Sequence, residues 1–151
     1  QSLSLLQRRG PPVAKNDGKD AEQAWLKAKQ RKGALVERVR DAKDLRGLNN
    51  GANLTDFKKP SDFLLAENNV LTFAEVKSVQ SGTSFAFSNI KQKQKTTALS
   101  LAAKGMGFLY VFYIFSYGRG QWFTMDGSKF AQINSEGRAS AKFEELTCIQ
   151  I

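Results

Sequence analysis

Two acidic residues and one lysine in the middle of the chain have the types and spacing of a chemical site. Glu75 and Lys77 stand two residues apart in an apolar segment. In a strand, both side chains would point to the same face. Such a pair is costly in a core and useful in a site, and Asp62, on a segment expected to pair with this strand, would add a second carboxylate. Two carboxylates and one carbonyl oxygen can hold a divalent cation that stabilises charge on a phosphodiester.

The alternative interpretation is an ordinary polar pair on a solvated sheet face, because Glu-x-Lys occurs by chance in many strands. The composition of the chain favours the site. There is no histidine and only one cysteine, Cys148, which excludes Ser-His-Asp triads, Cys-His pairs and zinc sites with histidine ligands. Catalysis would then depend on carboxylates, lysines or a metal bound by oxygen, and Mg²⁺ and Mn²⁺ are cations that prefer oxygen ligands.

The net charge indicates a polyanionic partner. The 151 residues include 23 Lys and Arg against 14 Asp and Glu, a formal charge of +9. Residues 1–60 hold 14 of the basic and 7 of the acidic residues, and residues 88–105 hold four lysines and no acid. A polyanion selects such charge because each neutralised phosphate releases counterions. Solubility is the simpler explanation, and an anionic membrane surface is disfavoured because no expected helix joins a basic face to a bulky apolar one.

The apolar patterns predict elements that would position these residues. A stripe at helical spacing runs from Ala21 to Val39, and alternating residues on either side of Asn68-Asn69 predict a β-hairpin. This order of elements predicts an α/β fold with a small mixed sheet flanked by helices. In chain order we expect a helix (20–43), two strands (61–66, 70–80), an extended piece (84–87), a helix (88–104), two strands (108–116, 121–125), a strand or loop (129–133), a short helix (139–145) and a last strand (146–151).

The middle of the chain also resembles a known family. Pro60-Ser61-Asp62 followed by Glu75-Val76-Lys77 resembles the signature of the PD-(D/E)xK nuclease superfamily. Thr83-Ser84-Phe85, then a helix that carries Gln94, then a glycine-led strand are similar to the corresponding segments of RecU-type Holliday junction resolvases. The resemblance covers about residues 56–126. It implies a restriction-endonuclease-like core and hydrolysis of DNA with Mg²⁺ as cofactor, for which Mn²⁺ would substitute.

The resemblance implies a role for each matching residue. Asp62 and Glu75 would be metal ligands, and the carbonyl of Val76 would complete the set. Lys77 would orient or activate the attacking water, and Gln94 would lie near the metal and the scissile phosphate.

An N-terminal helix in this superfamily often supplies a further catalytic acid, for which Glu22 is the candidate here. A helix-capping carboxylate is the alternative for Glu22. The chain departs from RecU-type enzymes in one segment, because residues 45–59 leave room for only a short version of the projecting stalk that those enzymes carry. The departure puts junction specificity in question more than nuclease chemistry, and a reduced, phage-like resolvase fits the size.

The domain organisation and the DNA contacts follow from the same features. Residues 1–18 are expected to form a flexible basic arm, and residues 19–151 a single nuclease domain. Phosphate contacts position DNA without reading its sequence, so recognition would depend on shape. The residues expected to contact DNA are Arg8, Arg9, Lys15, Lys58, Lys59, Lys91, Lys93 and Lys95.

The expected function is a structure-selective endodeoxyribonuclease, most specifically a Holliday junction resolvase that makes symmetric nicks in four-way DNA. Two symmetric cuts favour a homodimer. No apolar run has the roughly 18 residues of a membrane span, and the expected location is the cytoplasm of a bacterial or phage-infected cell. The alternatives are a flap or branch nickase, an exonuclease or a restriction-type nuclease on the same fold, and a non-catalytic protein that binds branched DNA.

Overall fold

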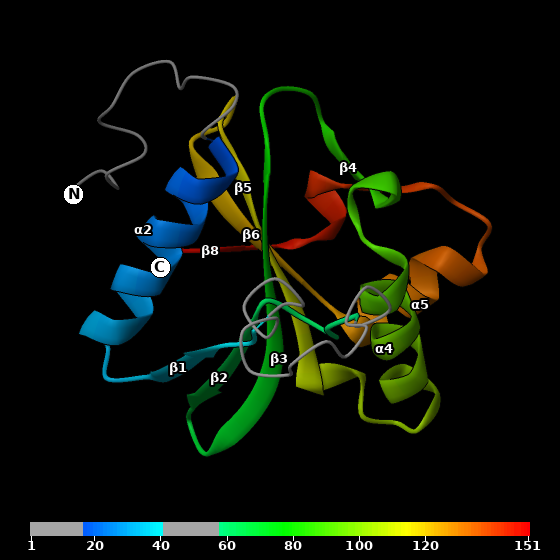
Figure 1. Cartoon of the computed structure of the whole chain (residues 1–151). Coiled ribbons are helices and arrows are strands. Elements are labelled where there is room, and N and C mark those ends of the chain that lie inside the picture. The colour runs from blue at the N-terminus through cyan, green and yellow to red at the C-terminus, as the bar shows by residue number, and fades with distance from the viewer. Residues whose placement is uncertain (1–16, 41–57) are drawn as a thin grey trace, which may run out of the picture.

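The computed structural model describes residues 17–40 and 58–151 (Figure 1). The expected basic arm, apart from its last two residues, and residues 45–57 of the segment compared with the stalk lie outside these ranges. The described helices are α2 (Asp17–Arg31), α4 (Gln92–Ala103) and α5 (Gly127–Ser135), with short 3₁₀ turns at Phe87–Asn89, Gly107–Leu109 and Phe143–Glu145. The strands are β1 (Leu35–Arg38), β2 (Phe63–Glu67), β3 (Val70–Val79), β4 (Ser84–Ala86), β5 (Tyr110–Ser116), β6 (Gln121–Asp126), β7 (Ser140–Lys142) and β8 (Thr147–Ile149).

Six of these strands form one mixed sheet in the order β1-β2-β3-β5-β6-β8. Its only parallel pair is β3 with β5, and α4 lies in the crossover between them. Strands β4 and β7 form a separate two-stranded sheet. The predicted class, an α/β fold with a small mixed sheet and flanking helices, is confirmed. Among the described residues, no helix combines the length and the apolar character needed to cross a bilayer.

The hairpin of β2 and β3 is the element that the sequence predicted best. Its turn consists of Asn68 and Asn69, both with positive φ (53° and 64°), as a two-residue hairpin turn requires. Asparagine tolerates this left-handed region better than most residues. The turn fixes an antiparallel register in which Phe63 pairs with Ala74.

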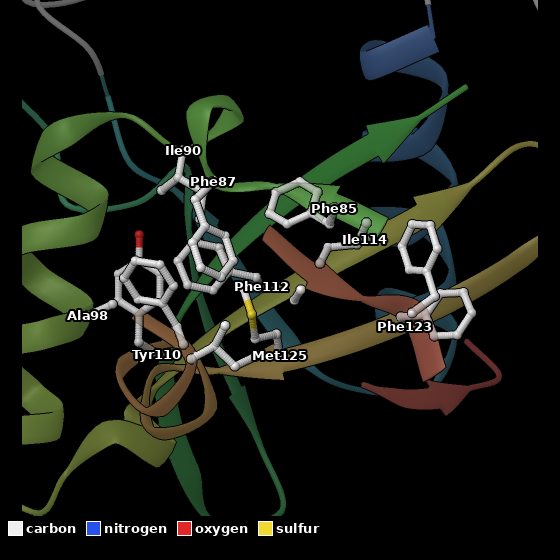
Figure 2. Packing of buried hydrophobic residues seen from close by; sticks show 13 residues of the cluster. Phe85, Phe87, Ile90, Ala98, Tyr110, Phe112, Ile114, Phe123 and Met125 are labelled. Atoms are coloured by element: carbon white, nitrogen blue, oxygen red, sulfur yellow. The ribbon is translucent and has the colours of Figure 1, made fainter. Parts of the chain in front are cut away.

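Each face of the sheet packs against its own helices, α2 on one side and α4 with α5 on the other (Figure 1). Trp25 of α2 contacts Phe63 and Tyr113, with ring centroids 5.0 and 5.2 Å apart. On the other face, aromatic residues of β5, β6 and α5 interlock with those of the β4 segment, as Figure 2 shows around Phe112 and Tyr110. Strand β3 serves both cores, because Ala74 and Val76 face α2 while Phe73 and Val79 face α4.

The helix predicted over residues 20–43 is wrong for residues 32–40, and its last three residues lie outside the described residues. Gly33 has φ +83°, and the N–H groups of Lys32 and Ala34 bond back to Ala28 and Lys29, which ends the helix. The chain then forms β1, which pairs antiparallel with β2. The apolar stripe is interrupted at this glycine, and tertiary pairing with β2 gives the rest of it extended backbone.

Two C-terminal predictions also need correction. Residues 129–133, expected as strand or loop, belong to helix α5, whose N-cap is Asp126: its side chain accepts a hydrogen bond from the Lys129 N–H at 2.8 Å. Residues 139–145, expected as a short helix, form strand β7 and a single 3₁₀ turn.

Candidate active site

The hairpin register places Asp62 beside Glu75. One residue beyond the Phe63–Ala74 pair, the antiparallel register brings Asp62 opposite Glu75. The Asp62 N–H donates to Glu75 Oε1 at 2.8 Å, and the Asp62 carbonyl accepts a hydrogen bond from the Val39 N–H, also at 2.8 Å. The segment that carries Asp62 is thus held between the end of β1 and the middle of β3.

Helix α4 brings Gln94 to the other oxygen of Glu75. Gln94 is buried, with 1% of its surface exposed, and its Nε2 donates to Glu75 Oε2 at 2.5 Å. Its Oε1 accepts a hydrogen bond from the Lys91 N–H at 3.1 Å, at the start of the helix. Because both ends of the amide have partners, its orientation is fixed by the network. Gln92, the other glutamine of this turn, is exposed and bonds to Thr96.

Two lysines lie against the carboxylates. Lys77 Nζ is 3.7 Å from Glu75 Oε2. Lys59 Nζ is 3.0 Å from Asp62 Oδ1 and also donates to the Val39 carbonyl at 3.3 Å. Both lysine side chains are about five-sixths buried, with 16% and 15% exposed. Four residues predicted to act together, Asp62, Glu75, Lys77 and Gln94, are therefore neighbours in the structure.

The two carboxyl groups titrate in opposite directions. The pKa of Glu75 is raised to about 8, mainly by burial. The negative charge of Asp62 also raises this pKa, and its effect is larger than the lowering by the positive charge of Lys77. Burial also acts to raise the pKa of Asp62, but hydrogen bonds from Glu75 and Lys59 outweigh it and hold the pKa of Asp62 below its ordinary value. In the metal-free protein near neutral pH, the pair therefore retains one proton, carried mainly by Glu75.

The donor set of this site consists of two carboxylates with amide and carbonyl oxygens nearby. In residues 17–40 and 58–151, no three His, Cys, Asp or Glu side chains come together as metal ligands. Carboxylate and neutral oxygen donors suit Mg²⁺, which retains several waters and needs only one or two carboxylates from the protein. The residues present fit such an ion.

The remaining predicted site residues, Val76 and Glu22, have other side-chain contacts. The Val76 side chain is buried against the α2 core, and the role of its carbonyl as a ligand stays a prediction. Glu22 lies on α2 and forms an ion pair with Arg38 of β1. Its role as a further acid also stays a prediction.

The basic residues expected to hold DNA are placed unevenly. Lys91 and Lys93 are exposed in the first turn of α4, next to Gln94, while Lys95 is half-buried. Lys58 is exposed, and Lys59 contacts Asp62 instead of solvent. Arg8, Arg9 and Lys15 lie outside the described residues.

Sequence reasoning missed the role of Tyr110. The Tyr110 hydroxyl donates to the Pro60 carbonyl at 2.5 Å, which ties the segment before Asp62 to the start of β5. Burial raises the pKa of Tyr110, and the charges of Glu75 and Asp62 raise it further, so the phenol stays protonated. Its position in an apolar run indicated a core residue, and no pattern in the sequence linked it to residue 60.

A hollow of about 620 Å³ has a lining that does not include Asp62, Glu75, Lys77 or Gln94. Phe108, Tyr113, Thr124, Asp126 and Gln132 are among its lining residues. The lining joins residues of both cores, since Tyr113 belongs to the core on the α2 side and Met125 to the core on the other side.

Comparisons with known proteins add a fold-level likeness. No family model matches the chain, and no curated protein matches it. Among solved structures, it is similar to Hjc of Archaeoglobus fulgidus, a Holliday junction resolvase from an archaeal hyperthermophile. The TM-score is 0.47 at 18% sequence identity, over 74% of this chain and 78% of that chain. A likeness at this level assigns no role to any residue.

Proposed function

We propose that this protein is a divalent-metal-dependent endodeoxyribonuclease that cuts branched DNA, with four-way junctions as its preferred substrate. One observation carries the proposal. Glu75 is completely buried. Its two carboxylate oxygens accept hydrogen bonds, one from the Asp62 backbone and the other from the Gln94 side chain. Burying a carboxylate beside a second one is unfavourable for folding alone, and such perturbed groups concentrate at functional sites.

Each residue of the network has a task in phosphodiester hydrolysis. Asp62 and Glu75, with the Val76 carbonyl, would hold Mg²⁺. The bound ion would supply Lewis-acid stabilisation of the charge that develops on the phosphate. Lys77 would orient the attacking water and add positive charge beside it, while Gln94 holds Glu75 in one orientation. Lys91 and Lys93, exposed on the same helix turn, would contact the DNA backbone.

Branched DNA is proposed as the substrate class from the resemblance of residues 56–126 to RecU-type resolvases. Lysines bind phosphates of any sequence, so selection would depend on the shape of the DNA. Two copies related by a twofold axis would place two such sites on opposite strands of a four-way junction. We therefore propose a homodimer as the active form.

The test is cleavage of a synthetic four-way junction by the purified protein with Mg²⁺. We expect paired nicks on opposing strands, and their loss in Asp62→Asn and in Glu75→Gln. Glu144→Gln, an exposed acid on the turn before β8, is the matched control and should cut like the wild type. Cleavage that survives both site substitutions would reject this active site.

A panel of linear, flapped and four-way DNA tests the substrate class separately. Preferential cutting of the four-way junction supports the proposal. Equal cutting of all three substrates would leave a nuclease without junction selectivity. Metal-independent binding to branched DNA without any cleavage would favour the non-catalytic alternative.

A further inference from the structure

The Lys59 ammonium group lies beside two oxygen atoms of the kind that bind a metal cation. Its ammonium group lies 3.0 Å from Asp62 Oδ1 and 3.3 Å from the Val39 carbonyl oxygen. A carboxylate oxygen and a carbonyl oxygen are the donors that a hard divalent cation takes. Only 15% of the Lys59 side chain is exposed, so this contact is not an ordinary surface ion pair.

The charges around the pair leave little room for an additional cation. Asp62 and Glu75, when both are ionised, are balanced by Lys59 and Lys77, which lie 3.0 and 3.7 Å from their oxygens. A divalent ion between the carboxylates would add two positive charges within a few ångströms of both ammonium groups. In a poorly solvated site such repulsion is strong, so one lysine has to withdraw.

Lys59 is the lysine that can withdraw. Lys77 is part of β3, whose backbone pairs with β5 at this position. Lys59 belongs to the irregular segment before β2, and its neighbour Lys58 is already exposed. A four-carbon side chain on such a segment can turn its ammonium group outward by rotamer changes alone.

We propose that Lys59 is a positioning residue that exchanges with the metal: it holds Asp62 in the metal-free enzyme, and metal binding releases it to a DNA phosphate. The proposal deepens the proposed function and rests on it, since it takes Asp62 as a metal ligand. Metal binding and DNA binding are then coupled, because the ion creates the phosphate contact by displacing the lysine. The enzyme would hold DNA at this point only when the metal needed for cleavage is present.

The first test measures Mn²⁺ binding to the DNA-free protein by electron paramagnetic resonance. Lys59→Met should bind Mn²⁺ more tightly than the wild type, by about tenfold, because one repelling charge has been removed. Lys58→Met, which removes the same charge from the adjacent exposed position, should change the affinity by less than about twofold, since exposed charges are screened. Lys59→Arg keeps the charge and should restore weak binding.

The direction of the change separates exchange from a merely structural role. If Lys59 only held the segment in shape, Lys59→Met would bind Mn²⁺ more weakly, and that result or an unchanged affinity would overturn the proposal. Asp62→Asn distinguishes this failure from that of the proposed function. If Asp62→Asn binds Mn²⁺ as the wild type does, Asp62 is not a ligand and the proposed function itself loses its metal site.

The second test measures binding of a fluorescent four-way junction with Ca²⁺ and with a chelator. Lys59→Met should weaken binding in Ca²⁺ and leave binding in chelator close to that of the wild type. Lys58→Met should weaken both to a similar degree, because its charge is available in either state. An equal loss for Lys59→Met under both conditions would contradict metal-driven release.

Discussion

At the scale of single residues, the site depends on how Glu75 is held. Its two oxygens have different partners, the Asp62 backbone and Gln94, so the carboxylate has one orientation before any metal binds. Preorganised ligands lose less freedom on binding, and groups that orient a metal ligand are typically important for its affinity. Asp62, Lys77 and Gln94 each contribute to the environment of this one buried acid.

We expect Gln94→Ala to lower Mg²⁺ or Mn²⁺ affinity by about 10- to 100-fold, because Glu75 loses the donor that orients it. Titration of the purified variant with Mn²⁺ gives the affinity directly. Gln92→Ala removes the exposed glutamine of the same helix turn and should leave the affinity unchanged. Equal effects of the two substitutions would show that the buried contact between Gln94 and Glu75 does not contribute to metal affinity.

The raised pKa of Glu75 predicts how stability varies with pH in the metal-free protein. The folded protein holds this proton up to about pH 8, whereas the unfolded chain releases it near the ordinary value of 4.5. The contribution to stability is complete below pH 4.5 and is lost as the pH rises from there to about 8. Asp62, whose pKa is lowered, acts in the opposite sense only at more acidic pH, below about 3.8.

Urea unfolding at several pH values between 5 and 8.5 measures this effect. Glu75→Gln is the matched variant, because its amide stays neutral throughout, so the stability of wild type relative to this variant should fall with pH. Saturating Mg²⁺ should reverse the trend for the wild type by replacing the proton. Parallel pH curves for the two proteins would show that Glu75 is ionised in the folded state.

At the scale of elements, the site is assembled where three segments meet. The end of β1 holds Asp62, β3 carries Glu75 and Lys77, and the first turn of α4 supplies Gln94. The start of β5 adds a fourth contact through Tyr110 and Pro60. The precision of the site therefore depends on how closely α4, α5 and the start of β5 pack.

Gly107, in the 3₁₀ turn before β5, packs closely against the start of α5. A Cβ atom at Gly107 would lie 2.2 Å from Ser128 Oγ and 2.6 Å from the Ser128 backbone nitrogen, at the start of α5. We expect Gly107→Ala to destabilise the fold by about 1–3 kcal/mol, because the backbone has to shift. Gly18→Ala in α2, where a Cβ meets nothing within 4 Å, should be neutral or slightly stabilising. Thermal or urea unfolding measures the stability of both variants. A Gly107→Ala variant as stable as the wild type would contradict the close packing.

At the scale of the whole molecule, exposed lysines lie on the helices of both faces of the sheet. Helix α4 presents Lys91 and Lys93 beside the site, whereas α2 covers the other face of the sheet (Figure 1). The formal charge of +9 gives the molecule a general attraction for polyanions. The proposed DNA orientation depends on the lysines near the site.

Replacing both Lys91 and Lys93 by Gln should lower the slope of log affinity against log salt by about two for duplex arms, because roughly one counterion is released per phosphate contact. Fluorescence anisotropy at a series of salt concentrations measures the slope. The matched control replaces Lys19 and Lys27, two exposed lysines of α2, by Gln. If both double variants lower this slope by the same amount, DNA is held by the net charge of the protein and not by the lysines at the start of α4.

The sequence by itself determined the parts of this protein that depend on local pattern. Asn68-Asn69, between two segments of alternating polar and apolar residues, specified the hairpin. The hairpin placed Asp62 opposite Glu75, and Lys77 lies on the same face of the strand because it is two residues after Glu75. The resemblance to RecU-type resolvases indicated Gln94, and the structure shows that Gln94 is buried whereas Gln92 is exposed. Where the pattern was locally ambiguous, at residues 32–40, 129–133 and 139–145, the predictions of secondary structure were wrong.

Only the tertiary structure decided which side chains share the site with those acids. Contacts between segments far apart in the chain set the Lys59–Val39 and Tyr110–Pro60 interactions, and no periodicity in the sequence encodes them. The same holds for Glu22, which the fold places against Arg38 of a strand that the sequence had suggested was helix. Local pattern fixes the direction of a side chain along its own element, whereas the packing of elements determines its partners, burial and charge.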